Sequence, residues 1–188
     1  MALGNQALRD RDFESAEKWF LAMLEHPEQL HQGRSYDENE SAAYYHLGLL
    51  EEARGDLSKA GSFFKTAVEQ PYPNLWHAAS YRENEYYAAL AAIKIGRMDI
   101  HEKVKERLLD CTSKSPASGV DFLPLGRLYW SALAAARGYM LDGRWFDASA
   151  ELDRLQQLYG QCWPLEEARR IVGLTEQRAC DSVIQGVG

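Results

Sequence analysis

The sequence predicts an all-α fold built from repeated helical hairpins, and three observations lead to this prediction. At 188 residues and 46% hydrophobic, the chain can bury one continuous core. Apolar side chains recur at spacings of three and four, which is the period of an amphipathic helix. One set of intervals, 12, 4 and 7 positions, occurs twice, in Gly4, Ala16, Phe20 and Pro27 and again in Gly48, Ala60, Phe64 and Pro71. One hairpin cannot bury its apolar faces alone, so the copies are expected to stack.

The first hairpin is predicted over residues 1–27, and it shares every interval with the second, over residues 40–71. Small residues at these positions let two helices cross closely, and a large aromatic side chain fills the space between one hairpin and the next. The alanines and phenylalanines of the pattern are therefore expected to be buried: Ala16, Phe20, Ala60 and Phe64.

The second hairpin also carries clear signals for its helix ends. The helical period breaks at "RGD", residues 54–56. Gly55 is expected to end the first helix, because glycine adopts positive φ at little cost, and Asp56 is expected to cap the next helix. Pro71 is expected to stop that second helix.

The third and fourth hairpins, over residues 82–111 and 127–159, follow the pattern less closely. The third has a turn at Gly96, but His101 replaces the small crossing residue and Lys105 replaces the aromatic. In the fourth, Leu152 replaces the aromatic, while four other positions recover the pattern: Ala136, Tyr139, Gly143 and Ala148.

Longer connections and a final helix complete the predicted domain, which spans residues 1–188. Successive units are 44, 41 and 47 positions apart, and the surplus lies in three segments rich in loop-forming residues: "EQLHQGRSYDENE", "YPNLWHAAS" and "TSKSPASGVDFLP". A helix predicted over residues 164–185 starts at Pro164 and shows one narrow apolar face, so it is expected to cap the array.

Composition excludes several classes of function. Lysine and arginine number 21 against 28 acidic residues, a net charge of −7 without a basic stripe, which argues against nucleic acid as partner. The three cysteines are far apart and lack CxxC spacing, so they indicate neither a disulfide framework nor a zinc site. We find neither a signal peptide nor a run of eighteen apolar residues. These features predict a cytoplasmic protein that does not contact a membrane.

The sequence also lacks the signatures of an enzyme. It contains no GxSxG, GxxxxGK[ST], GxGxxG or HExxH motif. The adjacent Glu51 and Glu52 point about 100° apart on a helix, so we interpret them as solvent-facing rather than as a catalytic pair. No two of the five histidines are three or four positions apart, which leaves no helical metal pair. We therefore expect a protein without catalytic activity, metal or cofactor.

The Leu47-Gly48 pair and the Ala60-x-x-x-Phe64 pattern resemble the tetratricopeptide (TPR) repeat. This resemblance implies a right-handed α-α superhelix with long insertions between repeats. The chain also resembles the C-terminal helical tail of large bacterial proteins whose preceding domain is a β-sandwich of unknown function, similar to carbohydrate-processing sandwiches. That second resemblance implies an accessory module, with the β-sandwich of the same polypeptide as a partner.

In the TPR family the first helix of each hairpin lines a concave groove, which implies a set of protein-binding residues here: Asn5, Arg9, Tyr45, Glu52, Tyr86, Lys94, Trp130, Arg137 and Met140. Leu49, Leu90 and Leu133 share the register and are equally well explained as core. Of the clamp that some TPR domains close around a chaperone's C-terminal carboxylate, only Asn5 is present, so that ligand is not expected.

The expected function is a scaffold that binds a protein segment or a neighbouring domain in this groove. Tyr45, Tyr86, Trp130 and Arg137 are the preferred contacts, because exposed aromatic residues and arginine concentrate binding energy. The alternative is an accessory module of a carbohydrate-active protein, with Trp76 and Trp163 near glycan. The first helix looks cut short, so a homodimer through residues 1–30 is a further expectation.

Overall fold

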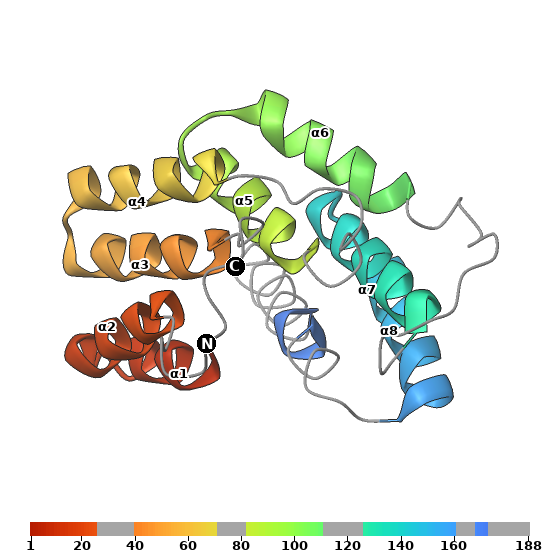
Figure 1. Cartoon of the computed structure of the whole chain (residues 1–188). Coiled ribbons are helices and arrows are strands. Elements are labelled where there is room, and N and C mark those ends of the chain that lie inside the picture. The colour runs from red at the N-terminus through yellow and green to blue at the C-terminus, as the bar shows by residue number, and fades with distance from the viewer. Residues whose placement is uncertain (26–39, 71–81, 111–125, 161–167, 173–188) are drawn as a thin grey trace, which may run out of the picture. The chain divides into compact units, whose positions relative to one another are not determined.

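The computed structural model describes residues 1–25, 40–70, 82–110, 126–160 and 168–172 (Figure 1). Within these ranges it contains helices and no strand, so the predicted all-α class is confirmed. The chain divides into two compact units, Met1–Val104 and Lys105–Gly188, and the boundary falls within one helix. The single domain over residues 1–188 stays a prediction.

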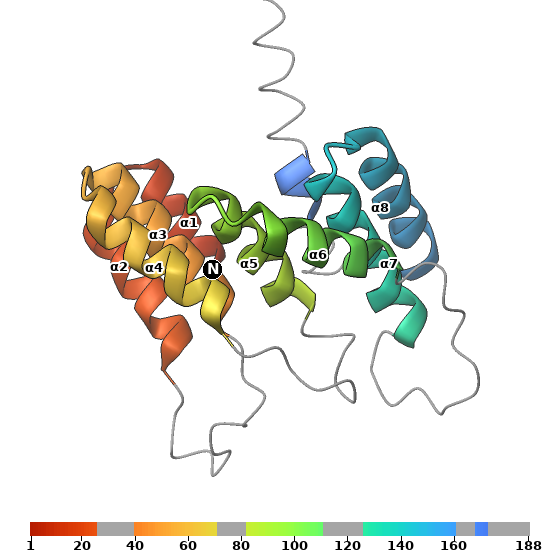
Figure 2. The same ribbon diagram turned by 90° about the horizontal axis from the view of Figure 1, so that it is seen from above.

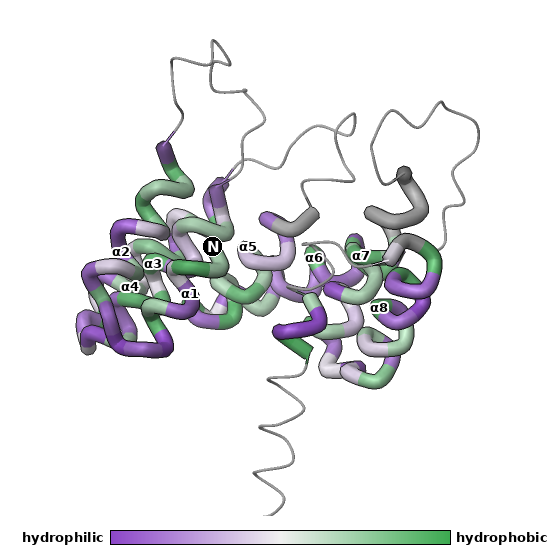
Figure 3. The backbone as a smooth tube through the Cα atoms, turned by 90° about the horizontal axis from the view of Figure 1, so that it is seen from below, coloured by the Kyte–Doolittle hydropathy of each residue, from purple (hydrophilic) through white to green (hydrophobic). Residues whose placement is uncertain are grey.

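The first unit holds three pairs of helices, of which the last is shared with the second unit. Its elements are α1 (Ala2–Arg9), α2 (Phe13–Leu21), the short 3-10 turn η1 (Ala22–Leu24), α3 (Ser41–Arg54), α4 (Leu57–Glu69), α5 (Arg82–Lys94) and the start of α6 (Met98–Leu109). The second unit holds the end of α6, α7 (Gly126–Leu141), α8 (Trp145–Tyr159) and a helical stretch at residues 168–172. Hydrophilic and hydrophobic residues are mixed along α2 and α4 (Figure 3), which bury one stripe each, whereas α3 and α5 are buried over most of their length.

The turns inside the helix pairs share one backbone geometry. The N–H of Gly55 donates to the carbonyl of Glu52, and the N–H of Asp56 donates to that of Glu51, so left-handed Gly55 (φ 88°) ends α3 as predicted. Arg11 takes the same place after α1 at φ 58°. In the other two turns the left-handed residue is again a glycine, Gly96 or Gly143.

Local signals also set the start and end of α4. The carboxylate of Asp56 accepts a hydrogen bond from the Lys59 N–H at 2.9 Å, which confirms the predicted cap. Asp12 caps α2 in the same way, at 3.1 Å from the Ser15 nitrogen. At its other end α4 stops at Glu69, and Gln70 is extended (ψ 141°), the conformation that a following proline favours.

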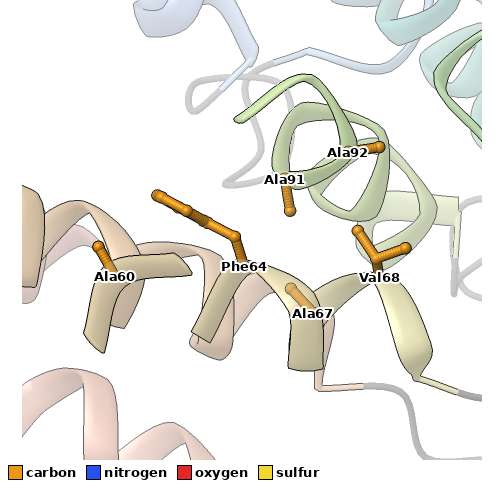
Figure 4. Packing of buried hydrophobic residues seen from close by; sticks show 6 residues of the cluster. All are labelled: Ala60, Phe64, Ala67, Val68, Ala91 and Ala92. Carbon is orange, nitrogen blue, oxygen red and sulfur yellow. The ribbon is translucent and has the colours of Figure 1, made fainter. Parts of the chain in front are cut away.

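In the first unit α1 to α5 pack on their neighbours in sequence. α3 lies against α2 and α4, and α5 lies against both α3 and α4 (Figures 1 and 2). Ala60, Phe64, Ala67 and Val68 of α4 meet Ala91 and Ala92 of α5 (Figure 4). Ala16 and Phe20 of α2 meet Leu47 and Leu50 of α3. The predicted burial of the patterned alanines and phenylalanines is thereby confirmed: Ala16, Phe20, Ala60 and Phe64 are at most 2% exposed.

The glycine and the phenylalanine of the repeated pattern touch each other inside each hairpin. A Cβ placed on Gly48 would lie 2.4 Å from Cε1 of Phe64, and one on Gly4 would lie 2.4 Å from Cε1 of Phe20. Each ring therefore rests on a backbone that cannot carry a side chain. In the fourth hairpin both positions change together, to buried Ala136 and buried Leu152.

Polar contacts fix the start of α3. The Ser41 hydroxyl donates to the Ala67 carbonyl at 2.7 Å, and the Asn84 side chain of α5 accepts from the Ala42 N–H at 3.1 Å. These bonds satisfy backbone groups that a helix end leaves without partners, and they tie α3 to α4 and α5. In the third hairpin, buried His101 approaches the Ala89 carbonyl with Nδ1 at 3.4 Å, so its ring takes the place of the small crossing residue.

In the second unit, α7 packs along α8. Gly138 of α7 also allows α6 to approach: a Cβ there would lie 2.9 Å from Cδ2 and 3.1 Å from the backbone nitrogen of Leu109. The Lys105 ammonium pairs with Asp142 at 3.1 Å. Of the capping helix predicted over residues 164–185, only 168–172 are described, and there Ala168 and Val172 are buried.

Candidate functional site

The predicted binding residues fall in both units. Asn5 and Arg9 lie on α1, Tyr45 and Glu52 on α3, and Tyr86 and Lys94 on α5, all in the first unit. Trp130, Arg137 and Met140 belong to α7 in the second unit. The side chain of Trp130 is outside the described part of the structure, as are Trp76 and Trp163 of the carbohydrate alternative.

Three of these residues are brought together where α3 lies beside α5. The Lys94 ammonium pairs with the Glu52 carboxylate at 2.7 Å and lies 5.7 Å from the centre of the Phe64 ring. The Tyr45 ring lies 5.9 Å from the same Phe64 ring. Helical spacing places half-buried Leu49 between Tyr45 and Glu52 on α3, and half-buried Leu90 four positions before Lys94 on α5. We call this surface the α3–α5 face: Tyr45, Leu49, Glu52, Leu90 and Lys94.

Asn5 and Arg9 remain on the surface of α1. Asn5 is half-buried and Arg9 is exposed, with its guanidinium donating to the Gln6 side chain at 2.6 Å. No contact described for this part of the chain joins either residue to the α3–α5 face.

Three other predicted residues are buried. Tyr86 and Met140 are 4% exposed and Arg137 is 5% exposed, so the exposure expected of Tyr86 and Arg137 is wrong. The Tyr86 ring lies 5.4 Å from the ring of Tyr87 on the same helix, so the two rings pack together in the core instead of facing a partner. Leu133, at 0% exposed, is a core residue.

A cluster of aromatic rings lies beneath the α3–α5 face. The His46 ring packs 5.2 Å from Phe20, 5.0 Å from Tyr87 and 5.5 Å from Tyr45, so it joins rings of α2, α3 and α5. The Tyr87 hydroxyl lies 3.2 Å from Sδ of Met1. Residue-by-residue reasoning missed this cluster, although one signal was present: Tyr45 and His46 are followed 41 positions later by Tyr86 and Tyr87.

Tyr45 belongs both to this aromatic cluster and to the α3–α5 face, and its surroundings shift the pKa of its hydroxyl. Burial and, to a smaller extent, the negative charge of Glu52 together raise the pKa of Tyr45 to about 12. Tyr45 therefore stays neutral across the physiological range, as a ring anchored on one side by packing and partly open on the other.

A charge network on a different side of α3 corrects a second expectation. Glu51 is 3% exposed rather than solvent-facing, and its Oε1 accepts from Arg54 at 2.9 Å and from Lys59 at 2.7 Å. Arg54 also donates to Glu17 of α2 at 2.6 Å, and this bond holds the pKa of the Glu17 carboxyl below its ordinary value. The network joins the first two hairpins, so its role is to hold the fold together.

Other features of the described residues offer less chemistry. Asp153, Gln156, Gln157 and Arg169 line a shallow depression in the second unit, in which Arg169 donates to Asp153. Within the described ranges, histidine, cysteine and acidic side chains form no group of three arranged to hold a metal ion. No helix in those ranges is both long and apolar enough to cross a membrane.

Comparison with known proteins gives no match, whether to a family model, to a curated protein or to a solved structure. Function is therefore inferred from the residues and from their geometry.

Proposed function

We propose that the chain is a non-catalytic interaction module of the tetratricopeptide type, a right-handed superhelix of hairpins that binds a protein segment on its first-helix surface. The observation that carries the proposal is the α3–α5 face, where an anchored aromatic ring, aliphatic side chains and a partly exposed ion pair lie together on two adjacent first helices.

The repeat architecture supports the tetratricopeptide part of the proposal. Each hairpin of the first unit packs on the next one along the chain, as in solenoids whose repeats contact only neighbours. The phenylalanine of the repeated pattern lies over the glycine in the same way in both copies, since a Cβ added to Gly4 or to Gly48 would lie 2.4 Å from Cε1 of the ring in each. The handedness of the superhelix follows from the family resemblance.

The energetics of the face suit a binding surface. The Glu52 and Lys94 side chains are 31% and 37% exposed, and a surface ion pair of this kind contributes about 0–1 kcal/mol. A partner can therefore exchange its own charges for this pair at little cost. Tyr45 is already packed against Phe64 and Tyr87, so its ring loses little conformational entropy on binding.

A segment that fits this face combines apolar side chains with one acidic and one basic group. The apolar groups would cover Leu49, Leu90 and the open side of Tyr45, and the charged groups would pair with Lys94 and Glu52. A helical or an extended peptide meets these requirements.

The test uses peptides selected from a random phage-displayed library on the wild-type chain. Their dissociation constants are measured by fluorescence anisotropy for the wild type and for the double variant Glu52→Lys, Lys94→Glu. This variant keeps the net charge and keeps an ion pair, but it reverses the charges that the partner meets. Loss of a charge-matched contact should weaken binding by about tenfold or more.

The matched control exchanges another ion pair, in the variant Lys65→Glu, Glu69→Lys. This pair lies on α4, at 3.8 Å and with side chains 68% and 63% exposed. The control should bind the selected peptides as the wild type does. Equal affinity of all three folded proteins, judged by circular dichroism, would show that the α3–α5 face is not the binding site.

A further inference from the structure

The first two hairpins are copies of each other at an offset of 44 residues. Cβ atoms on Gly4 and Gly48 would meet the same three atoms of Phe20 and Phe64, at 2.4, 2.7 and 3.1 Å in one hairpin and 2.4, 2.6 and 2.9 Å in the other. The left-handed residue after the first helix is likewise at the same place, Arg11 or Gly55. A residue of the first hairpin can therefore be compared with the one 44 positions later.

One face of the second hairpin is covered by α2. Leu47 and Leu50 of α3 are at most 1% exposed and form a cluster with Ala16 and Phe20 of α2. Phe63 of α4 packs on the same cluster. This contact is the stacking interface between the two hairpins.

The equivalent face of the first hairpin is open. Leu3, which corresponds to Leu47, is 59% exposed, and Trp19, which corresponds to Phe63, is 41% exposed. The position of Leu50 is taken by exposed Gln6. We call this surface the first-hairpin outer face: Leu3, Gln6, Asp10 and Trp19.

The charges of the two faces differ at one position. In the covered interface, Arg54 of the second hairpin pairs with Glu17 of α2 at 2.6 Å. Asp10 stands 44 positions before Arg54, and its carboxylate accepts from Gln6 at 3.0 and 2.9 Å. A helix that covers the outer face as α2 covers the second hairpin would therefore meet an acidic group where α2 meets a basic one.

We infer that the first-hairpin outer face binds an amphipathic helix of a partner protein that resembles α2. Such a helix carries a small residue and, four positions later, an aromatic one, as Ala16 and Phe20 do in α2. Directly after the small residue it carries lysine or arginine in place of Glu17, to pair with Asp10. The small residue lets the helix approach the hairpin closely, and the aromatic side chain fills the space over Leu3 and Trp19.

The test presents such a helix to the face by covalent linkage, which keeps its local concentration high. A copy of residues 1–44 is placed directly before Met1 of the full chain, which preserves the 44-residue offset. The copy carries Glu17→Lys, and a matched graft keeps Glu17. The original hairpin carries Leu3→Cys as a reporter, and its rate of alkylation by iodoacetamide is measured by mass spectrometry, which separates it from the natural cysteines.

A second reporter controls for general changes in reactivity. Ile93→Cys lies on α5, where the side chain is 45% exposed. In the lysine graft, alkylation at position 3 should slow by about tenfold or more relative to the natural-length chain, with position 93 unchanged, as expected when one face alone becomes covered. The graft that keeps Glu17 should slow alkylation at position 3 by a smaller factor than the lysine graft does.

Several results would overturn the inference. Unchanged alkylation at position 3 in a folded lysine graft would show that the face does not accept this helix. Equal protection by both grafts would refute the pairing with Asp10. Protection in the natural-length chain, together with a dimeric mass in sedimentation, would identify a second copy as the occupant instead. If the graft does not fold, a peptide of residues 12–25 with Glu17→Lys, titrated into the Leu3→Cys chain, gives the same readout.

Discussion

Replacement of Gly48 by alanine should destabilise the chain, because the Phe64 ring occupies the space of the added methyl group. The new Cβ would lie 2.4 Å from Cε1 and 2.6 Å from Cδ1 of the ring. Ordinary contacts begin near 3.4 Å, so the ring would have to move by about 1 Å in a core where Phe64 is 2% exposed. Overpacking of this kind costs about 1–3 kcal/mol, while the change from glycine to alanine inside a helix regains about 1 kcal/mol.

The net loss expected for Gly48→Ala is therefore about 0–2 kcal/mol in the free energy of unfolding. Gly61 supplies the control, because it also lies inside a helix but has no heavy atom within 4 Å of an added Cβ. Gly61→Ala should stabilise the chain by about 0.8–1 kcal/mol through helix propensity alone. Urea denaturation followed by circular dichroism measures both values.

A double variant tests the cause of the loss. Phe64→Leu removes the ring atoms that meet the new methyl group, and the fourth hairpin already pairs buried Ala136 with buried Leu152 at the equivalent positions. The double-mutant cycle for Gly48→Ala and Phe64→Leu should give a favourable coupling of about 0.5–3 kcal/mol. Additive effects, or stabilisation by Gly48→Ala, would refute the conclusion that the ring requires a glycine there.

Three further predictions concern stability. Arg11→Gly should raise the free energy of unfolding by about 0.5–1 kcal/mol, because glycine is not strained at φ 58°; a lower or unchanged urea midpoint would contradict this. The hydrogen bond from Arg54 lowers the pKa of Glu17 from 4.5, so the stabilising effect of this carboxylate is present above pH 4.5 and is lost as the pH falls through the folded-state pKa. The variant Glu17→Gln should lack this acid-dependent loss when the free energy of unfolding is measured from pH 6 downward. The same pH profile in the variant and in the wild type would contradict the prediction. Ala60→Leu should cost about 1–3 kcal/mol, because the 1% exposed Ala60 lies at a close helix crossing, and an unchanged melting temperature would show that the crossing tolerates the larger side chain.

Local sequence rules were sufficient to predict the helix ends at Gly55 and Asp56 and the pattern of buried residues in the core. Gly55 ends α3 and Asp56 caps α4 because these effects depend only on the backbone preferences of single residues and their nearest neighbours. The intervals that link Gly48, Ala60 and Phe64 predicted a close crossing, since close contact between two helices restricts which side chains fit at fixed spacings.

The left-handed arginine and the buried acid could not be predicted in this way. Nothing local distinguishes Arg11 from any other charged turn residue, yet it adopts the conformation that glycine adopts in the other turns. Acidic side chains usually face solvent, but Arg54 and Lys59 pair with Glu51, and Glu17 of α2 pairs with Arg54 in turn, so Glu51 is 3% exposed.

The sequence by itself determined the helical class, the turn geometry at Gly55 and the small and aromatic residues of the core, because each depends on the period of one helix or on contacts within one hairpin. Only the tertiary structure decided which side chains of that period remain accessible. Tyr45 and Tyr86 occupy equivalent positions 41 residues apart, yet Tyr45 is half-buried and Tyr86 is 4% exposed. The physical reason is that the exposure of a helical side chain depends on how the neighbouring helices cover it, and that cover comes from residues far away in the sequence.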